Sequence, residues 1–209
     1  MPRSSGPETS EKIQKMDYKQ TALILVGYQN DYFAKDGILR GVVEEPGRVD
    51  EVLNNTLALI TRLAPTEASI LSTPIVLTPD YRALASPVGI LHTIKESGAF
   101  AAGTLGAQDI PELKAFGDRI QYVKGKVGFN AFSDTLLDEV LKAKGIKEVL
   151  LAGMVTSLCI DSTGRAAYER GYSVKVLSDC TSARTLVEQS YFCSSVFPLY
   201  GAVVSSSQV

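Results

Sequence analysis

Short apolar runs alternate along the chain with segments whose apolar residues recur at helical spacing. The apolar runs predict buried strands at residues 21–26, 74–78, 120–123, 148–152, 173–177 and 202–204. Apolar positions three and four residues apart predict helices over 48–64, 134–144, 159–170 and 186–197. Residues 86–113 mix glycine and alanine with short apolar runs, which predicts a long loop with brief helices.

This strand–helix alternation predicts an α/β fold, a three-layer α/β/α arrangement around a mostly parallel central sheet of about six strands. No internal repeat or linker divides residues 20–209, so we expect a single domain there. Residues 1–19 are polar and are expected to form a disordered N-terminal arm. In parallel sheets of this kind, ligands bind beyond the carboxyl ends of the strands, which is where we look for chemistry.

Composition narrows the function classes. The 209 residues are 45% hydrophobic and 21% charged with a net charge of −2, which is typical of a soluble globular protein. The cations form no basic stripe, so a nucleic-acid partner is excluded, and no run approaches the roughly 18 apolar residues of a membrane span. No apolar N-terminal stretch resembles a signal peptide, so a cytoplasmic location is expected, with unconventional secretion left open.

The three cysteines and the lone histidine carry no metal or disulfide signature. The cysteines stand at unrelated spacings, and their odd number favours a reducing compartment. His92 lies in a mixed segment and is expected to be an ordinary surface or loop histidine. We therefore expect neither a metal nor another cofactor.

Cys159 stands where a parallel sheet would present a nucleophile. It follows the predicted strand 148–152, and Thr156 can cap the helix that begins near it. A thiol in the first helical turn meets free amide N–H groups and the positive end of the helix dipole, which favour the thiolate. The alternative is a small buried hydrophobe, which is what we expect of Cys180 and Cys193. The local pattern at Cys159 favours an enzyme.

Lys124 directly follows the predicted strand 120–123 and would reach the same edge of the sheet as Cys159. By itself it could be a lysine that extends from a strand end into water. Beside a cysteine, the same cation would favour the thiolate and stabilise the negative charge of a tetrahedral intermediate.

Three segments together resemble one family. They are Gly153-Met-Val-Thr-Ser-Leu-Cys159, the upstream Lys124, and Leu25-Val-Gly-Tyr-Gln-Asn-Asp-Tyr-Phe33. The combination is similar to the isochorismatase-like cysteine hydrolases, which include nicotinamidases, carbamoylsarcosine amidases and isochorismatase, over about residues 21–205. The resemblance implies a Rossmann-type topology, a small-molecule substrate, no cofactor and a homo-oligomer, either a dimer or a tetramer.

The resemblance also implies roles for individual residues. Cys159 matches the family nucleophile, which forms a thioester with an amide carbonyl, and Lys124 matches the catalytic lysine. The backbone N–H groups of Val155 and Cys159 match the oxyanion hole, which follows a cis peptide bond between Met154 and Val155. We expect further substrate contacts from Tyr28, Gln29, Arg82 and Thr156. For Arg82 the alternative is a solvated surface charge.

Gly27 departs from the family pattern, because it stands where the family has a catalytic aspartate. Glycine can neither accept the thiol proton nor return it. Two other carboxylates are candidates to substitute: Asp31, four residues further on, and Asp80, which follows the neighbouring predicted strand. Three explanations are open: a deliberate replacement, a natural non-catalytic protein that binds a family-type ligand, or catalysis in which Lys124 and the helix N-terminus activate Cys159.

The sequence therefore predicts a hydrolase of a small molecule. Its activity is expected to be impaired or absent, because Gly27 stands in the place of the aspartate. Hydrolysis of an amide C–N bond through a Cys159 thioester is one reaction, and hydrolysis of isochorismate is the other. The retained Cys159 points toward amide chemistry. The alternative function is a non-catalytic small-molecule-binding or regulatory protein.

Overall fold

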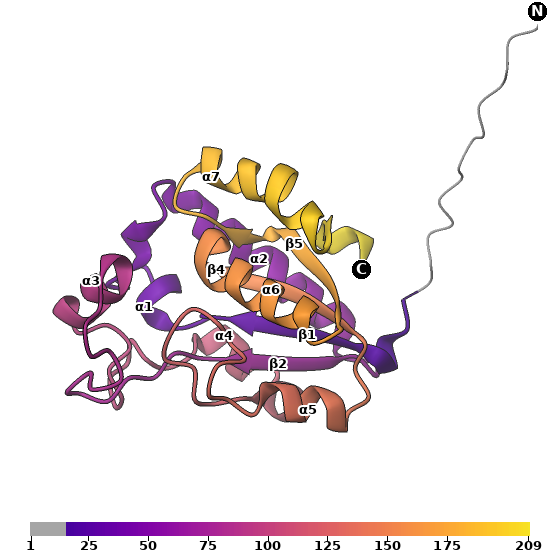
Figure 1. Cartoon of the computed structure of the whole chain (residues 1–209), viewed down its shortest axis with the longest axis horizontal. Helices are drawn as coiled ribbons and strands as arrows, with labels where there is room; N and C mark the ends of the chain where they lie inside the picture. Colours follow the sequence, from indigo (N-terminus) through magenta and orange to yellow (C-terminus); the bar gives the residue numbers. More distant parts are fainter. Residues whose placement is uncertain (1–15) are drawn as a thin grey trace, which may run out of the picture.

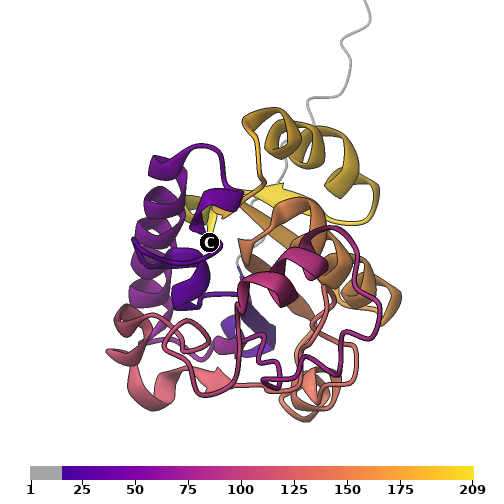
Figure 2. The same cartoon turned by 90° about the vertical axis from the view of Figure 1, so that its left-hand side faces the viewer.

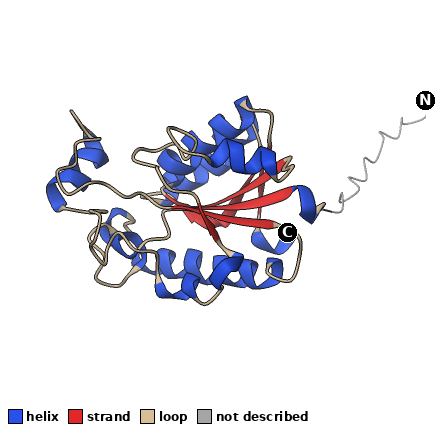
Figure 3. Cartoon of the chain, turned by 90° about the horizontal axis from the view of Figure 1, so that it is seen from below, coloured by secondary structure: helices blue, strands red, loops and turns tan. Residues whose placement is uncertain are grey.

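The computed structural model describes residues 16–209 and has a six-stranded parallel sheet between two layers of helices (Figures 1 and 3). The strand order is β3-β2-β1-β4-β5-β6. The strands are β1 Thr21–Val26, β2 Ser69–Thr73, β3 Gln121–Tyr122, β4 Glu148–Met154, β5 Ser173–Ser182 and β6 Ala202–Val204. The helices are α1 Asn30–Phe33, α2 Pro46–Leu63, α3 Gly89–Ser97, α4 Pro111–Lys114, α5 Leu137–Ala143, α6 Asp161–Glu169 and α7 Leu186–Tyr191. The predicted α/β/α fold with a parallel sheet is confirmed.

The sheet is built around β1 and β4, which are paired and buried at its centre. All residues of β1 are buried, and its residues Ala22 to Val26 contribute alternately to the two faces of the core. At the carboxyl ends Val26 pairs with Gly153. A Cβ atom on Gly153 would lie 1.9 Å from the Val26 carbonyl oxygen, so only glycine allows the two strands to approach this closely. The turn that follows β4 is thereby held against the turn that follows β1.

Each face of the sheet has its own apolar core. On one face, α2 packs Val49, Val52, Leu59 and neighbouring apolar residues against the sheet. On the other face, α5 and α6 bury Leu137, Leu141 and other small or branched side chains. These two layers are the blue bands above and below the red sheet in Figure 3.

The strand order reverses between β1 and β4, which creates a crevice at their carboxyl ends. In Figure 1 this edge points toward α1 and α3, and in Figure 2 it faces the viewer. The loop between β2 and β3 crosses this edge and contains α3. The segments that follow β1 and β4, which contain Gly27 and Cys159, therefore lie together at this edge.

The second strand is displaced from its predicted place. The predicted strand 74–78 was wrong, because β2 is Ser69–Thr73 and pairs with β1 through its whole length. The strand includes two buried polar residues, Ser72 and Thr73, and the Thr73 hydroxyl donates to the Leu25 carbonyl. The more apolar segment after Pro74 lies beyond the strand, where Leu77 forms only an isolated bridge to Ala101.

Two further boundaries differ from expectation. The expected loop 86–113 contains the nine-residue helix α3 as well as the brief α4. Of the expected N-terminal arm, residues 1–15 lie outside the described residues, whereas residues 16–19 are ordered and lead into a 3-10 helix, Tyr18–Gln20, capped by Asp17. Within residues 16–209, no helix is long and apolar enough to cross a membrane.

A carboxyl group is enclosed between the edge of the sheet and the loop before α4. Asp109 lies beside the hydroxyls of Ser72 and Tyr122, and burial raises its pKa to about 6 although both hydroxyls lower it. Asp109 Oδ1 and Ser72 Oγ are buried, and neither has a hydrogen-bond partner among residues 16–209. Protonation of Asp109 is therefore more favourable in the native state than in the unfolded chain.

This burial predicts a pH-dependent stability. Because the native pKa of about 6 lies above the ordinary value of 3.8, the stabilisation that Asp109 gives is complete below about pH 4 and is lost as the pH rises through 6. The variant Asp109→Asn does not titrate there. We expect its free energy of unfolding, relative to wild type, to rise by about 1–2 kcal/mol between about pH 4 and pH 8 in urea denaturation. The exposed Asp118→Asn is the matched control, and an identical pH dependence for both variants would contradict the assignment.

Candidate active site

Cys159 lies in a tight turn between β4 and α6. The turn Thr156–Ile160 is π-helical, and the N–H groups of Leu158 and Ile160 both donate to the Val155 carbonyl. Such π-helical turns are rare and often occur at functional sites. The Cys159 side chain is only 3% exposed, and the peptide bond between Met154 and Val155 is cis, as expected. The Val155 N–H donates to no residue among 16–209, so it remains free to bind an oxygen atom.

The cation beside Cys159 is Lys126 rather than Lys124. Lys126 is fully buried, and its Nζ donates to the Gly128 carbonyl at 2.5 Å and to Cys159 Sγ at 3.5 Å. Lys124 is exposed. The predicted lysine was therefore misplaced by two residues.

The error has a local cause. Val123 still bonds to β2, so the chain is extended at Lys124 and directs that side chain to solvent. Gly125 then turns the chain with a φ of 113°, and Lys126 enters the protein. The glycine between the two lysines was the available signal, since it marks a change of direction before the second lysine.

Among residues 16–209, no carboxylate forms an ion pair with Lys126. Burial lowers the pKa of Lys126, while the Cys159 sulfur raises it through its charge and through the hydrogen bond. Cys159 is therefore the ionisable group in hydrogen-bond contact with Lys126.

Gly27 lies beside the cis peptide, at the end of β1. Its φ is 74°, and a Cβ atom built on it would lie 3.4 Å from both the Met154 carbonyl oxygen and the Tyr32 ring. Tyr32 is 2% exposed, and burial, the Cys159 charge and Asp31 all raise its pKa. The space next to Gly27 is thus bordered by a neutral phenol, a residue that the sequence reasoning missed.

Neither of the two alternative carboxylates replaces the missing one. Asp31 is buried and accepts a hydrogen bond from the Phe100 N–H at 2.6 Å. Its carboxyl group also packs so closely on Gly106 that a Cβ there would lie 2.1 Å away. Asp80 is exposed and accepts a hydrogen bond from the Thr78 hydroxyl. Asp31 anchors a loop, and Asp80 belongs to a surface turn.

The expected substrate contacts are mostly engaged in structural hydrogen bonds. The Tyr28 hydroxyl bonds Thr56 at 2.6 Å, beneath α2. The Gln29 amide is saturated by the backbone of Ile75 and of residue 107, at 2.6 to 2.8 Å. Arg82 is exposed, and no hydrogen bond or ion pair of its guanidinium is seen among residues 16–209. Among residues 16–209, no hydrogen bond therefore joins any of these three side chains to Cys159.

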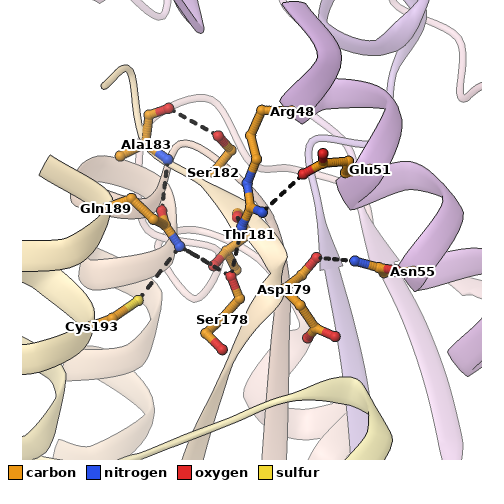
Figure 4. A network of polar contacts seen from close by, with 10 residues as sticks. All are labelled: Arg48, Glu51, Asn55, Ser178, Asp179, Thr181, Ser182, Ala183, Gln189 and Cys193. Atoms are coloured by element: carbon orange, nitrogen blue, oxygen red, sulfur yellow. Dashed lines mark hydrogen bonds and ion pairs between the residues drawn. The ribbon is translucent and has the colours of Figure 1, made fainter. Parts of the chain in front are cut away.

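Thr156 is held by a buried glutamine of α7. Its hydroxyl donates to Gln189 Oε1 at 2.7 Å, and the Ala183 N–H donates to the same oxygen. Gln189 Nε2 donates to Ser178 O and to the Thr181 hydroxyl, both at 3.2 Å, as Figure 4 shows. Gln189 therefore fixes the Cys159 turn to the irregular part of β5.

An open cavity adjoins the Cys159 turn. It has a volume of about 360 Å³ and is bordered by Ser157 and Leu158 of that turn. Its other lining residues are Val88, Gly89, Ile90, Phe129, Arg184 and Glu188. Arg184 and Glu188 form an ion pair at 3.2 Å on its rim. A second hollow of about 290 Å³ lies at the amino ends of the strands, around Lys147 and Lys175, and is remote from this chemistry.

The Gln189 network predicts a stability effect. Replacing Gln189 by Leu leaves the Thr156 hydroxyl and the Ala183 N–H without partners, whereas the Thr181 hydroxyl keeps its hydrogen bond to the Leu177 carbonyl. We expect a loss of about 2–3 kcal/mol in the free energy of unfolding, since each unpaired buried group costs about 1–3 kcal/mol. Urea denaturation measures the loss. Ser190→Ala, at an exposed neighbouring position, is the control, and equal stabilities of the two variants would contradict the network's importance.

The surroundings of the three thiols predict an order of reactivity. Burial raises the pKa of Cys180 to about 12 and also raises that of Cys193. Cys159 has the Lys126 ammonium beside its sulfur. We expect iodoacetamide to alkylate Cys159 first near neutral pH, as measured by peptide mapping over time. Equal labelling of all three, or a Cys159 rate unchanged in Lys126→Met, would contradict the role of Lys126.

Comparisons with known proteins agree with this fold. The "Isochorismatase domain" family model matches residues 21–208. Nicotinamidase 3 of Arabidopsis thaliana is 28% identical over 182 residues, covering 87% of this chain and 83% of that protein. YddQ, an isochorismatase family protein of Bacillus subtilis, is 28% identical over 171 residues, covering 79% of each. The cysteine hydrolase of Pseudomonas syringae has a similar fold, with a TM-score of 0.78, 19% identity and 92% of each chain covered. The expected family is confirmed, and the chain belongs to the isochorismatase-like cysteine hydrolases.

Proposed function

We propose that this protein hydrolyses a small amide through a thioester on Cys159. The observation that carries the proposal is the contact between Lys126 Nζ and Cys159 Sγ, at 3.5 Å in a buried site. A buried ammonium next to sulfur favours the thiolate, which is the nucleophilic form. The position at the switch point of the sheet, next to an open cavity, supports access by a small molecule.

The reaction begins with attack of the Cys159 thiolate on the carbonyl carbon. The developing oxyanion accepts hydrogen bonds from the Val155 and Cys159 N–H groups, which are fixed before the reaction and so need no reorganisation. Collapse of the tetrahedral intermediate breaks the C–N bond, and the leaving nitrogen takes up a proton from the Lys126 ammonium, which becomes a neutral amine. Water then hydrolyses the thioester and releases a carboxylic acid.

The cavity supports a substrate with a compact apolar body. Val88, Ile90, Phe129 and Leu158 supply apolar walls, and the Arg184–Glu188 pair gives one polar rim. A volume of about 360 Å³ lies at the lower end of the usual range for small-molecule sites. Isochorismate hydrolysis is less well supported, because the site has no carboxyl group at position 27 to protonate an enol ether.

The second candidate function is ligand binding without turnover. The specific observation in its favour is the absence of any side chain at Gly27, next to Tyr32. A carboxylate placed there would be the acid–base group that a full hydrolase site needs. The two functions differ in what a restored carboxylate would do.

The variant Gly27→Asp tests the missing group, and Gly27→Asn is its matched control. Both variants carry a side chain at a φ of 74°, so both should lose about 1 kcal/mol of stability. Only aspartate supplies an acid–base group, so we expect it to raise kcat/KM at least about tenfold over asparagine. The assay uses a panel of small amides together with isochorismate. Substrates that bind but are turned over no faster by Gly27→Asp would contradict the missing-acid argument.

Cys159→Ala separates the two functions directly. Loss of all turnover with retained binding supports thioester chemistry. Turnover by Cys159→Ala at the wild-type rate would refute it, and binding without turnover by the wild-type protein would favour the second candidate.

A further inference from the structure

Lys126 is a buried lysine with one ionisable hydrogen-bond partner, Cys159. This arrangement indicates a role beyond that of a fixed positive charge. Its Nζ bonds only to the Gly128 carbonyl and to Cys159 Sγ among residues 16–209. A lysine that serves as a fixed cation is usually balanced by a carboxylate when it is buried. Here the balancing group is the nucleophile itself, and that group loses its charge when it is acylated.

We propose that Lys126 is the general base of the deacylation step, taking a proton from the water that hydrolyses the Cys159 thioester. This inference rests on the proposed thioester function and assigns the proton transfer within it. Lys126 already lies at hydrogen-bond distance from the sulfur atom that carries the acyl group. A water molecule on the thioester carbonyl carbon is therefore within reach of the same amine.

The electrostatics of the site support this assignment. Burial lowers the pKa of Lys126, and only the Cys159 charge and hydrogen bond raise it. A thioester sulfur carries no negative charge, so both opposing contributions disappear on acylation. Lys126 then loses its proton more readily, and it becomes a neutral amine at the stage when a base is required.

The other titratable groups near Cys159 are not suited to act as the general base. Burial keeps Tyr32 a neutral phenol, since its pKa is raised. The Asp31 carboxylate is turned to the Phe100 N–H and to the loop at Gly106. Position 27 has no side chain at all. Lys126 is thus the group in contact with the sulfur that can accept a proton.

The step balances as follows. The neutral Lys126 amine takes one proton from water while the water oxygen bonds to the thioester carbonyl carbon. The tetrahedral intermediate expels Cys159 as a thiolate by breaking the C–S bond, and the carboxylic acid leaves. The resulting Lys126 ammonium again faces the Cys159 thiolate, which restores the resting ion pair.

The test uses p-nitrophenyl acetate, because nitrophenolate leaves without a proton and acylation is thereby separated from deacylation. Lys126→Arg keeps the cation but cannot act as a base, since arginine stays protonated. We expect it to give a nitrophenolate burst and an acetylated Cys159 peptide, with deacylation slowed by about 10²–10⁴. Lys126→Met, which loses the cation, should slow the burst as well. Deacylation by Lys126→Arg within about tenfold of wild type would overturn the proposal.

A measurement on the wild-type enzyme keeps the test valid if Lys126→Arg does not fold. Acetyl-enzyme formed at neutral pH is moved to a series of pH values, and its deacylation is followed by mass spectrometry. We expect the rate to rise to a plateau with a midpoint below the ordinary lysine pKa of about 10.4. Tyr32→Phe should keep the same midpoint. A rate without such a midpoint, or a midpoint that disappears in Tyr32→Phe, would overturn the role of Lys126.

The same experiment distinguishes this inference from the proposed function. If wild-type Cys159 is not acetylated, or if Cys159→Ala gives the same burst, the thioester chemistry itself is refuted. If Cys159 is acetylated but the Lys126→Arg and pH results fail, only the proton transfer is refuted.

Discussion

The site depends on how closely β1 and β4 approach at their carboxyl ends. Val26 and Gly153 are paired there, and any side chain on Gly153 would overlap the Val26 carbonyl. This contact brings Gly27 against the Met154–Val155 peptide and leads the chain directly into the π-helical turn that holds Cys159. The position of Cys159 is therefore set by backbone packing between two central strands, while side chains supply only its surroundings.

Within those surroundings, one buried charge decides how the thiol behaves. Lys126 gives up the hydration of its ammonium group and receives in return only a carbonyl oxygen and a sulfur. Burying a cation without a carboxylate is unfavourable, and the hydrogen bonds to the Gly128 carbonyl and to Cys159 Sγ offset part of the cost. The proposed reactivity of the thiol rests on the second of these contacts. The Gln189 hydrogen bonds stabilise the other side of the turn, so that Thr156 is fixed from α7.

The sequence predicted the place of every strand in the sheet except that of β2. The runs 21–26 and 202–204 coincide with β1 and β6, because continuous apolar or β-branched segments leave little choice of position. The second strand was misplaced because pairing with β1 selects Ser69–Thr73, although Ile75 and Leu77 are more apolar. The hydrophobicity of a strand can be read from its own sequence, whereas its register depends on the strand with which it pairs.

The site was predicted in part, for a similar reason. Cys159 and the cis peptide followed from a local motif, which the backbone reproduces. Lys126 was missed because its burial depends on the turn at Gly125, two residues beyond the predicted strand. The roles expected for Tyr28 and Gln29 stay predictions, and their polar atoms form hydrogen bonds with backbone and hydroxyl groups far away in the sequence. The sequence motif that contains Tyr28 and Gln29 did not show that their polar atoms already form hydrogen bonds within the fold.

The anchoring of the long β2–β3 loop has a consequence for how such a protein can diversify. Three consecutive residues after β1 hold it: Gln29 bonds residue 107, Asn30 bonds the backbone at 105 and 108, and Asp31 bonds Phe100. The part of the loop that lines the cavity, at the start of α3, lies outside these attachment points. Insertions and replacements around Val88 and Ile90 can therefore accumulate without loosening the scaffold, so new ligand preferences can evolve while the thiol and its cation stay unchanged.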